Sequence, residues 1–335
     1  MHSKAQATAE VELQLGAWAE PETLLNYSLP EWQNLRASGI RHFFIECFKH
    51  GRLDVRMLDT TRPDYLPRLL REQLGDQVAV HAWVHTLRWS IDHRSATRAE
   101  LHSAHPQPLS GPHHLACDLR SYSDLLLTHG AGHLSWDIER NGGLFADATR
   151  LHDGLRLVDS PLLWACEQIA ANPDIQTIHL DYCRYPNPNI DPLRRHIAYC
   201  QQHGEHEKHH RPRNIALLLQ ALVARFGRAR LSATPIAALN LEVGQDCRDF
   251  FRLMHVVVPQ CYSETDRQVR DFLECCGDAQ MMGGVVHGPL PAHPYGAHAQ
   301  IARIRRLGDG HTGLVGVCFW KLSPRLVKEL AVAGA

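Results

Sequence analysis

The sequence predicts an α/β protein folded as one closed (β/α)₈ barrel, also called a TIM barrel, and three observations lead to this fold class. Eight short apolar runs of strand length recur along the 335 residues. Amphipathic, helix-like stretches separate most of these runs. Several runs are apolar at consecutive positions, which is typical of strands buried on both faces of a parallel sheet. Eight such units in about this length favour a barrel, with a doubly wound open sheet as the alternative.

The predicted strands are runs rich in aliphatic and aromatic residues, which fit a pleated and buried surface. In chain order they are residues 11–18, 40–48, 78–85, 177–183, 230–235, 255–262, 281–288 and 313–320. The predicted helices between them are residues 29–39, 62–75, 160–173, 213–227, 266–277 and 298–308. Helix ends carry the expected signals, since Pro161 can occupy the first turn after a Ser160 cap, and glycine closes five of the six.

One interval breaks the strand and helix rhythm. Residues 86–176 separate the third and fourth predicted strands, which is far longer than an ordinary connection. In a barrel, such an insertion follows the C-terminal end of a strand and therefore shapes the catalytic face. No linker or repeat marks a boundary, so we expect one domain over residues 1–335 with an insertion at about 86–160.

Composition excludes several classes of protein. Lys and Arg total 35 against 36 Asp and Glu, so no global basic field is available to bind nucleic acid. The chain has no apolar run long enough for a membrane span. The N-terminus has no apolar stretch like a signal peptide, so the chain as given is expected to be cytoplasmic, with a removed leader left open. Ten scattered cysteines indicate buried free thiols.

A carboxylate closes the fourth predicted strand. Side chains alternate along a strand, so His179, Asp181 and Cys183 are expected to share one face. Asp181 then stands near the strand end, where catalytic groups of barrels lie, and Arg184 follows it. The alternative is an ion pair between Asp181 and Arg184 that only holds the loop in place.

The segment HLDYCRYPN, residues 179–187, resembles the signature of the glycosyl-hydrolase-like 10 family, a group of (β/α)₈ proteins. The resemblance extends over about residues 35–320, through VAVHAWVHTLRW, RPRNIALLLQAL, RLSATPIA and HVVVPQCY in the family's order. It implies an enzyme that hydrolyses glycosidic bonds in an oligo- or polysaccharide. That chemistry uses two carboxyl groups, roughly 5–5.5 Å apart for retention of configuration or 6.5–9.5 Å for inversion.

Asp181 is the first predicted catalytic carboxyl group, and the second remains open between two acids. Glu264 follows the sixth predicted strand, where Gln260, Tyr262 and Glu264 form one polar row if that face lines the barrel. Glu46 lies in the second predicted strand. We rank Glu264 slightly ahead of Glu46.

Carbohydrate binding needs flat apolar rings beside hydrogen-bonding groups. The predicted substrate-binding residues lie at or beyond strand ends, with Trp320 the strongest aromatic platform; they are His81, Trp83, Asp137, Arg184, Tyr185, Gln260, Tyr262 and Trp320. For each of these aromatic residues the alternative is core filling.

The 24 histidines do not form a ligand pattern, and no metal or other cofactor is predicted. His81 and His85 share a strand face but are about 13 Å apart by strand rise. The histidines of residues 203–210 lie in a polar loop. Two other functions stay open: a non-catalytic barrel that binds a carbohydrate or a protein, and a metal-dependent hydrolase using His81 and Asp181.

Overall fold

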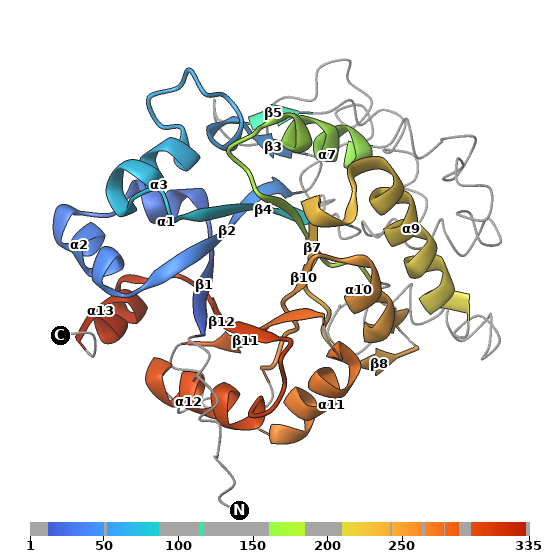
Figure 1. Ribbon diagram of the computed structural model, residues 1–335. Coiled ribbons are helices and arrows are strands. Elements are labelled where there is room, and N and C mark those ends of the chain that lie inside the picture. Colours follow the sequence, from blue (N-terminus) through green and yellow to red (C-terminus); the bar gives the residue numbers. More distant parts are fainter. Residues whose placement is uncertain are drawn as a thin grey trace, which may run out of the picture.

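Eight parallel strands form a closed ring in the computed structural model (Figure 1). The structure describes residues 13–49, 52–86, 114–116, 161–184, 210–241, 243–262, 265–277, 279–287 and 296–332. In ring order the strands are β1 (Gln14–Ala19), β2 (Ile40–Lys49), β4 (Ala79–His85), β6 (Thr177–Asp181), β7 (Leu231–Ala233), β10 (Val256–Val257), β11 (Gln280–Val286) and β12 (Leu314–Trp320). Strand β1 pairs with both β2 and β12, and this double pairing closes the ring. The predicted (β/α)₈ barrel is confirmed, and each predicted strand overlaps one of these eight.

Helices surround the ring on its outside (Figure 1). They are α1 (Pro21–Leu25), α2 (Leu29–Ala37), α3 (Leu66–Leu74), α7 (Pro161–Ala171), α9 (His210–Phe226), α10 (Cys247–Leu253), α11 (Asp266–Cys276), α12 (Ala297–Leu307) and α13 (Pro324–Val332). All six predicted helices are present. The sequence reading missed α1 and α10, which are too short to show a helical period, and α13, which follows the last strand and packs against α2.

Side-chain alternation divides the core into two layers. The larger layer lies between the strands and the surrounding helices. The smaller layer fills the inside of the barrel and consists of Trp18, Phe44, Trp83, Val258, Met282 and Cys318. Val258, which follows β10, belongs to the inner layer, so the alternate row that continues to Gln260 faces the barrel interior. The sequence had left this face open.

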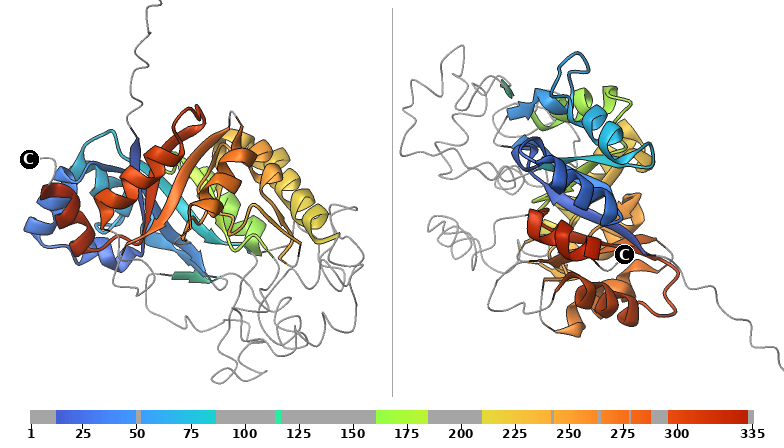
Figure 2. Two further views of the ribbon diagram at one scale, coloured as in Figure 1. Left: turned by 90° about the horizontal axis from the view of Figure 1, so that it is seen from below. Right: turned by 90° about the vertical axis from the view of Figure 1, so that its left-hand side faces the viewer.

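Two short strands extend the sheet beyond the ring. Strand β3 (Arg52–Asp54) pairs antiparallel with the end of β2, and β5 (His114–Ala116) pairs antiparallel with β3. They lie at the end of the barrel to which β2 points (Figure 2). The predicted insertion at about 86–160 lies outside the described residues except for Thr86 and β5. A separate hairpin is formed by β8 (Leu239–Asn240) and β9 (Gln245–Asp246).

The described cysteines are free thiols, and all but Cys275 are buried. This agrees with the prediction from their scattered spacing. In the described part of the chain, no helix combines the length and the apolar character that crossing a bilayer requires.

Candidate active site

The C-terminal ends of β2, β4 and β6 bring the candidate catalytic groups together. The register pairs His85 with Asp181 across β4 and β6, and Glu46 with Trp83 across β2 and β4. These pairings place two carboxyl groups on strands that flank β4, at the same mouth of the barrel. This is the end at which barrel enzymes hold their reacting groups.

Asp181 is buried, with 4% of its surface exposed, and both carboxylate oxygens accept a hydrogen bond. The indole Nε1–H of Trp83 donates to Oδ2 at 3.0 Å. The backbone N–H of Tyr182 donates to Oδ1 at 2.6 Å. These two hydrogen bonds fix the orientation of the carboxylate at the mouth of the barrel.

The turn after Asp181 has an unusual backbone. Tyr182 has φ of 51°, in the left-handed region that few residues other than glycine adopt. This turn ends the strand alternation, so Cys183 packs in the outer core layer and does not follow Asp181 towards the interior. The expectation that Cys183 shares a face with Asp181 is therefore wrong. The Tyr182 ring lies 4.9 Å from the ring of His85, and the Arg184 guanidinium lies 5.4 Å from the Tyr182 ring.

Glu46 is largely buried at the end of β2, with 17% of its side chain exposed. Its Oε2 is 2.8 Å from Nζ of Lys49 and 3.5 Å from Nε2 of His85. Burial raises the pKa of Glu46 above its ordinary value, and the neighbouring Lys49 opposes part of that shift. Glu46 therefore keeps its proton to a higher pH than an exposed glutamate does.

Three tryptophan rings stack edge to face beside Asp181. The centroid of Trp320 lies 5.2 Å from that of Trp83 and 5.9 Å from that of Trp18. Trp18 and Trp83 are buried, whereas Trp320 is partly exposed. Trp320 is therefore the ring of the three that a ligand can reach. Trp83, predicted as a substrate platform, instead contacts Asp181 from within the core.

Two further predicted substrate-binding residues, Gln260 and Tyr262, follow β10 in the chain. Burial and the negative charge of Asp181 both raise the pKa of the Tyr262 hydroxyl, so the two side chains interact electrostatically. Gln260 is partly exposed, and its backbone N–H donates to the carbonyl of Pro235.

Of the remaining predicted site residues, only His81 lies in the part of the chain that the structure describes, and it is not brought together with Asp181. His81 lies four residues before His85, where it pairs with Thr177 and lines a cavity at the opposite mouth. Glu264, Asp137 and Tyr185 lie outside the described residues, as do the histidines at 203–209. Among the described residues, no group of three or more His, Cys, Asp or Glu side chains is arranged to hold a metal ion.

His85 and Tyr182 are site residues to which the sequence pattern gave no role. The face of His85 was predictable, because His85 follows His81 and Trp83 at alternate positions of one strand. The position of Tyr182 was not predictable, because strand alternation places it with Leu180 on the outer face. Only the turn after Asp181 brings its ring to His85.

No family model matches the chain, and no curated protein matches it. Solved structures with a similar fold include the spore cortex-lytic enzyme SleL of Bacillus cereus, at 10% identity over 96% of this chain and 74% of that chain, with a TM-score of 0.48. A fungal endo-beta-N-acetylglucosaminidase of glycosyl hydrolase family 18 has 12% identity over 95% and 97% of the two chains, with a TM-score of 0.47. A family 18 N-acetylglucosaminidase of Paenibacillus barengoltzii has 12% identity over 97% and 100%, also with 0.47. Sequence identities and TM-scores this low are no basis for assigning the activity of these enzymes to this chain.

Proposed function

We propose that this protein is a glycoside hydrolase whose active site lies at the C-terminal mouth of the barrel. The observation that carries the proposal is the buried carboxylate of Asp181, held by two hydrogen-bond donors at the end of β6. A second carboxyl group with a raised pKa, Glu46, lies two strands away in the ring. Glycosidases use such a pair, in which one group is protonated and the other ionised.

In the proposed reaction, Glu46 donates its proton to the glycosidic oxygen as the bond from that oxygen to the anomeric carbon breaks. Asp181 stabilises the positive charge that develops on the sugar ring, either by attacking the anomeric carbon or by activating a water. If Asp181 attacks the anomeric carbon, Glu46 takes a proton from the water that displaces Asp181, which restores both groups. If Asp181 activates the water, it takes the proton of that water, and proton exchange with solvent then restores both groups. The resemblance of residues 179–187 to the glycosyl-hydrolase-like 10 family supports the same role for Asp181. Glu264 is the alternative proton donor.

The proposed substrate is an oligo- or polysaccharide. Trp320 offers a partly exposed ring at the mouth, and the apolar C–H face of a pyranose packs well on such a ring. Gln260 and Arg184 provide hydrogen-bonding groups near the same mouth.

The test is hydrolysis of a panel of polysaccharides and aryl glycosides by wild type, Asp181→Asn and Glu46→Gln. Both variants keep the side-chain shape, and we expect each to lose at least about 100-fold in kcat, as removal of a catalytic acid or base does. Asp76→Asn and Glu72→Gln change exposed acids and are the matched controls. Undiminished turnover by Asp181→Asn would refute the proposal, and binding by wild type without turnover would indicate a non-catalytic barrel. If Asp181→Asn loses turnover and Glu46→Gln keeps it, Glu264 becomes the candidate proton donor.

A further inference from the structure

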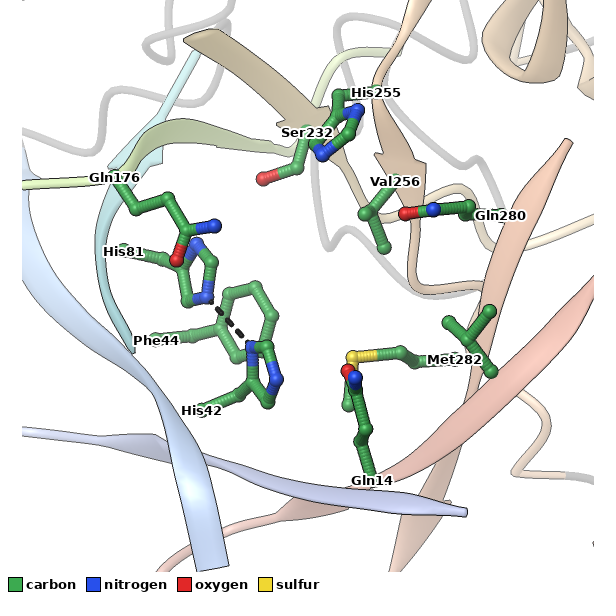
Figure 3. Close-up of a pocket in the computed structure, with 11 residues that line it drawn as sticks. Gln14, His42, Phe44, His81, Gln176, Ser232, His255, Val256, Gln280 and Met282 are labelled. Atoms are coloured by element: carbon green, nitrogen blue, oxygen red, sulfur yellow. Dashed lines mark hydrogen bonds between the residues drawn. The ribbon is translucent and has the colours of Figure 1, made fainter. Parts of the chain in front are cut away.

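A cavity of about 170 Å³ opens at the N-terminal mouth of the barrel, opposite Asp181. Its polar lining comes from residues near the N-terminal ends of the strands, which are Gln14, His42, His81, Gln176, Ser232, His255 and Gln280 (Figure 3). Its apolar lining includes Phe44 and Met282. The volume exceeds the roughly 10–15 Å³ needed for one water, and it is smaller than the roughly 300–1,000 Å³ of pockets for drug-sized ligands.

A chain of hydrogen bonds runs through the barrel interior to this cavity. It begins at Trp18, whose indole Nε1–H donates to Nε2 of His179 at 3.2 Å. Nδ1 of His179 lies 3.0 Å from Oγ of Ser232. Ser232 Oγ in turn lies 2.8 Å from Oγ1 of Thr177. All four residues are buried, so the chain is isolated from solvent along this part.

The chain continues from Thr177 to the cavity wall. Oγ1 of Thr177 lies 2.8 Å from Nδ1 of His81. Nε2 of His81 lies 3.1 Å from Nδ1 of His42, the contact drawn in Figure 3. His42 is partly exposed and lines the cavity. Burial lowers the pKa of all three imidazoles, so each is neutral at pH 7.

The indole sets the direction at the start of this chain of hydrogen bonds, because it can donate and cannot accept. Nε2 of His179 must accept, so its Nδ1 carries the hydrogen and donates to Ser232. In a first arrangement, Ser232 donates to Thr177, and Thr177 donates to Nδ1 of His81. His81 therefore carries its hydrogen on Nε2 and donates to Nδ1 of His42. The one remaining hydrogen is on Nε2 of His42, at the cavity.

Two other arrangements satisfy the same five contacts. In both, Nδ1 of His81 donates to Thr177, and Nδ1 of His42 donates to Nε2 of His81. The unused hydrogen is then on Ser232 if Thr177 donates to it, or on Thr177 if Ser232 donates. Ser232 borders the cavity, but it and Thr177 have almost no solvent-accessible surface, and an unsatisfied buried donor costs about 1–3 kcal/mol. In the first arrangement the unused donor is on partly exposed His42 and can be solvated. The first arrangement is therefore favoured.

We propose that this cavity binds a small uncharged polyhydroxy compound, with one of its oxygens accepting a hydrogen bond from Nε2–H of His42. The residues that line the cavity include no Asp, Glu, Lys or Arg, so a charged ligand would be desolvated without a counter-charge. Carboxamides of Gln14, Gln176 and Gln280 can each donate to and accept from hydroxyl groups. A metal ion bound by His42 would need the lone pair at Nε2, where the chain of hydrogen bonds places a hydrogen.

The first experiment reads the tautomers by NMR of protein labelled with ¹⁵N-histidine. We expect Nδ1–H on His179 and Nε2–H on both His81 and His42. A His42 that carries its hydrogen on Nδ1 would overturn the proposal. This result does not depend on whether the protein hydrolyses glycans.

The second experiment titrates glycerol and D-glucose separately and follows the same His42 signals, which report on this mouth and not on Asp181. We expect a saturable shift, and Gln176→Leu or Gln280→Leu should each weaken binding about 2- to 10-fold, the effect of one hydrogen bond. Gln33→Leu changes an exposed glutamine on α2 and should leave binding unchanged. A response to acetate or Zn²⁺ larger than to either polyol, or no saturable shift, would overturn the proposal. Asp181→Asn should bind as wild type does, even if it is inactive.

Discussion

The indole of Trp83 donates a hydrogen bond to the carboxylate of Asp181 from the neighbouring strand of the barrel, at 3.0 Å. Trp83 is a residue of β4 and Asp181 ends β6, so the bond links the two strands inside the mouth. Trp83 also contacts Trp320 edge to face. One buried ring thus positions both the candidate catalytic carboxylate and the candidate sugar-binding ring.

Trp83→Phe should keep the aromatic packing and remove the donor to Asp181. We expect kcat to fall roughly 10- to 100-fold, the range for one hydrogen bond to a charged group. Steady-state kinetics on the best substrate of the panel measures this, and thermal unfolding checks the fold. Trp164→Phe changes a partly buried ring on α7 and is the control. An unchanged kcat for Trp83→Phe would show that the indole does not support catalysis.

Glu46→Gln should be more stable than wild type at neutral pH. Burial raises the pKa of Glu46 in the folded state, so its protonated form contributes stability that is lost as the pH rises through that pKa. Glutamine stays neutral, so we expect equal stability at about pH 4 and an advantage for the variant at about pH 7. Urea unfolding at both pH values measures the difference. Glu72→Gln, on the exposed side of α3, should show no such pH dependence, and the opposite sign for Glu46→Gln would refute the assignment.

His179→Asn should make stability less sensitive to acid. Burial lowers the pKa of His179 to about 3, so between about 6.5 and 3 the unfolded chain binds a proton that the folded barrel does not. The free energy of unfolding therefore falls as the pH falls through this range. Below pH 6, we expect the free energy of unfolding of the variant to fall with pH by about 1.4 kcal/mol per pH unit less than that of wild type. Urea unfolding over that range tests it against exposed His311→Asn, and equal slopes for wild type and His179→Asn would contradict it.

Trp320→Ala should weaken substrate binding more than it slows the chemical step. Loss of ring packing on a sugar is expected to raise KM roughly 3- to 10-fold, the effect of about 0.5–1.5 kcal/mol. Trp320→Phe keeps a ring at this position and should retain most of the affinity. Kinetics on a polysaccharide and on a short aryl glycoside separate the two effects. A fall in kcat at constant KM would place Trp320 in the chemistry instead.

Much of the fold could be predicted because it depends on local patterns. The eight apolar runs mark the strands. Glycine and proline mark helix ends that lie close to the observed ends of α2, α3 and α11. Strand β10 shows the limit, since the run at 255–262 predicts eight residues and the ladder holds only Val256–Val257. Its later residues continue along the barrel wall, with Gln260 joined to Gly284 by an isolated bridge.

The site was only partly predictable. Asp181 could be identified because a carboxylate that closes an apolar strand is costly unless it is held by partners or used. The sequence could not show that Trp83 is one of those partners, or that His81 belongs to the opposite mouth. Both depend on the register between β4 and β6, which pairs His85, and not His81, with Asp181.

By itself, the sequence determined the alternation of strands and helices, the barrel it favours and the position of Asp181 at a strand end. These follow from hydrophobic periodicity and turn chemistry, which act over a few neighbouring residues. Only the tertiary structure decided which groups meet, because strands distant in sequence must first align in one register. The bond from Trp18 to His179, between residues 161 positions apart, exists because the closed ring turns both side chains into the same interior.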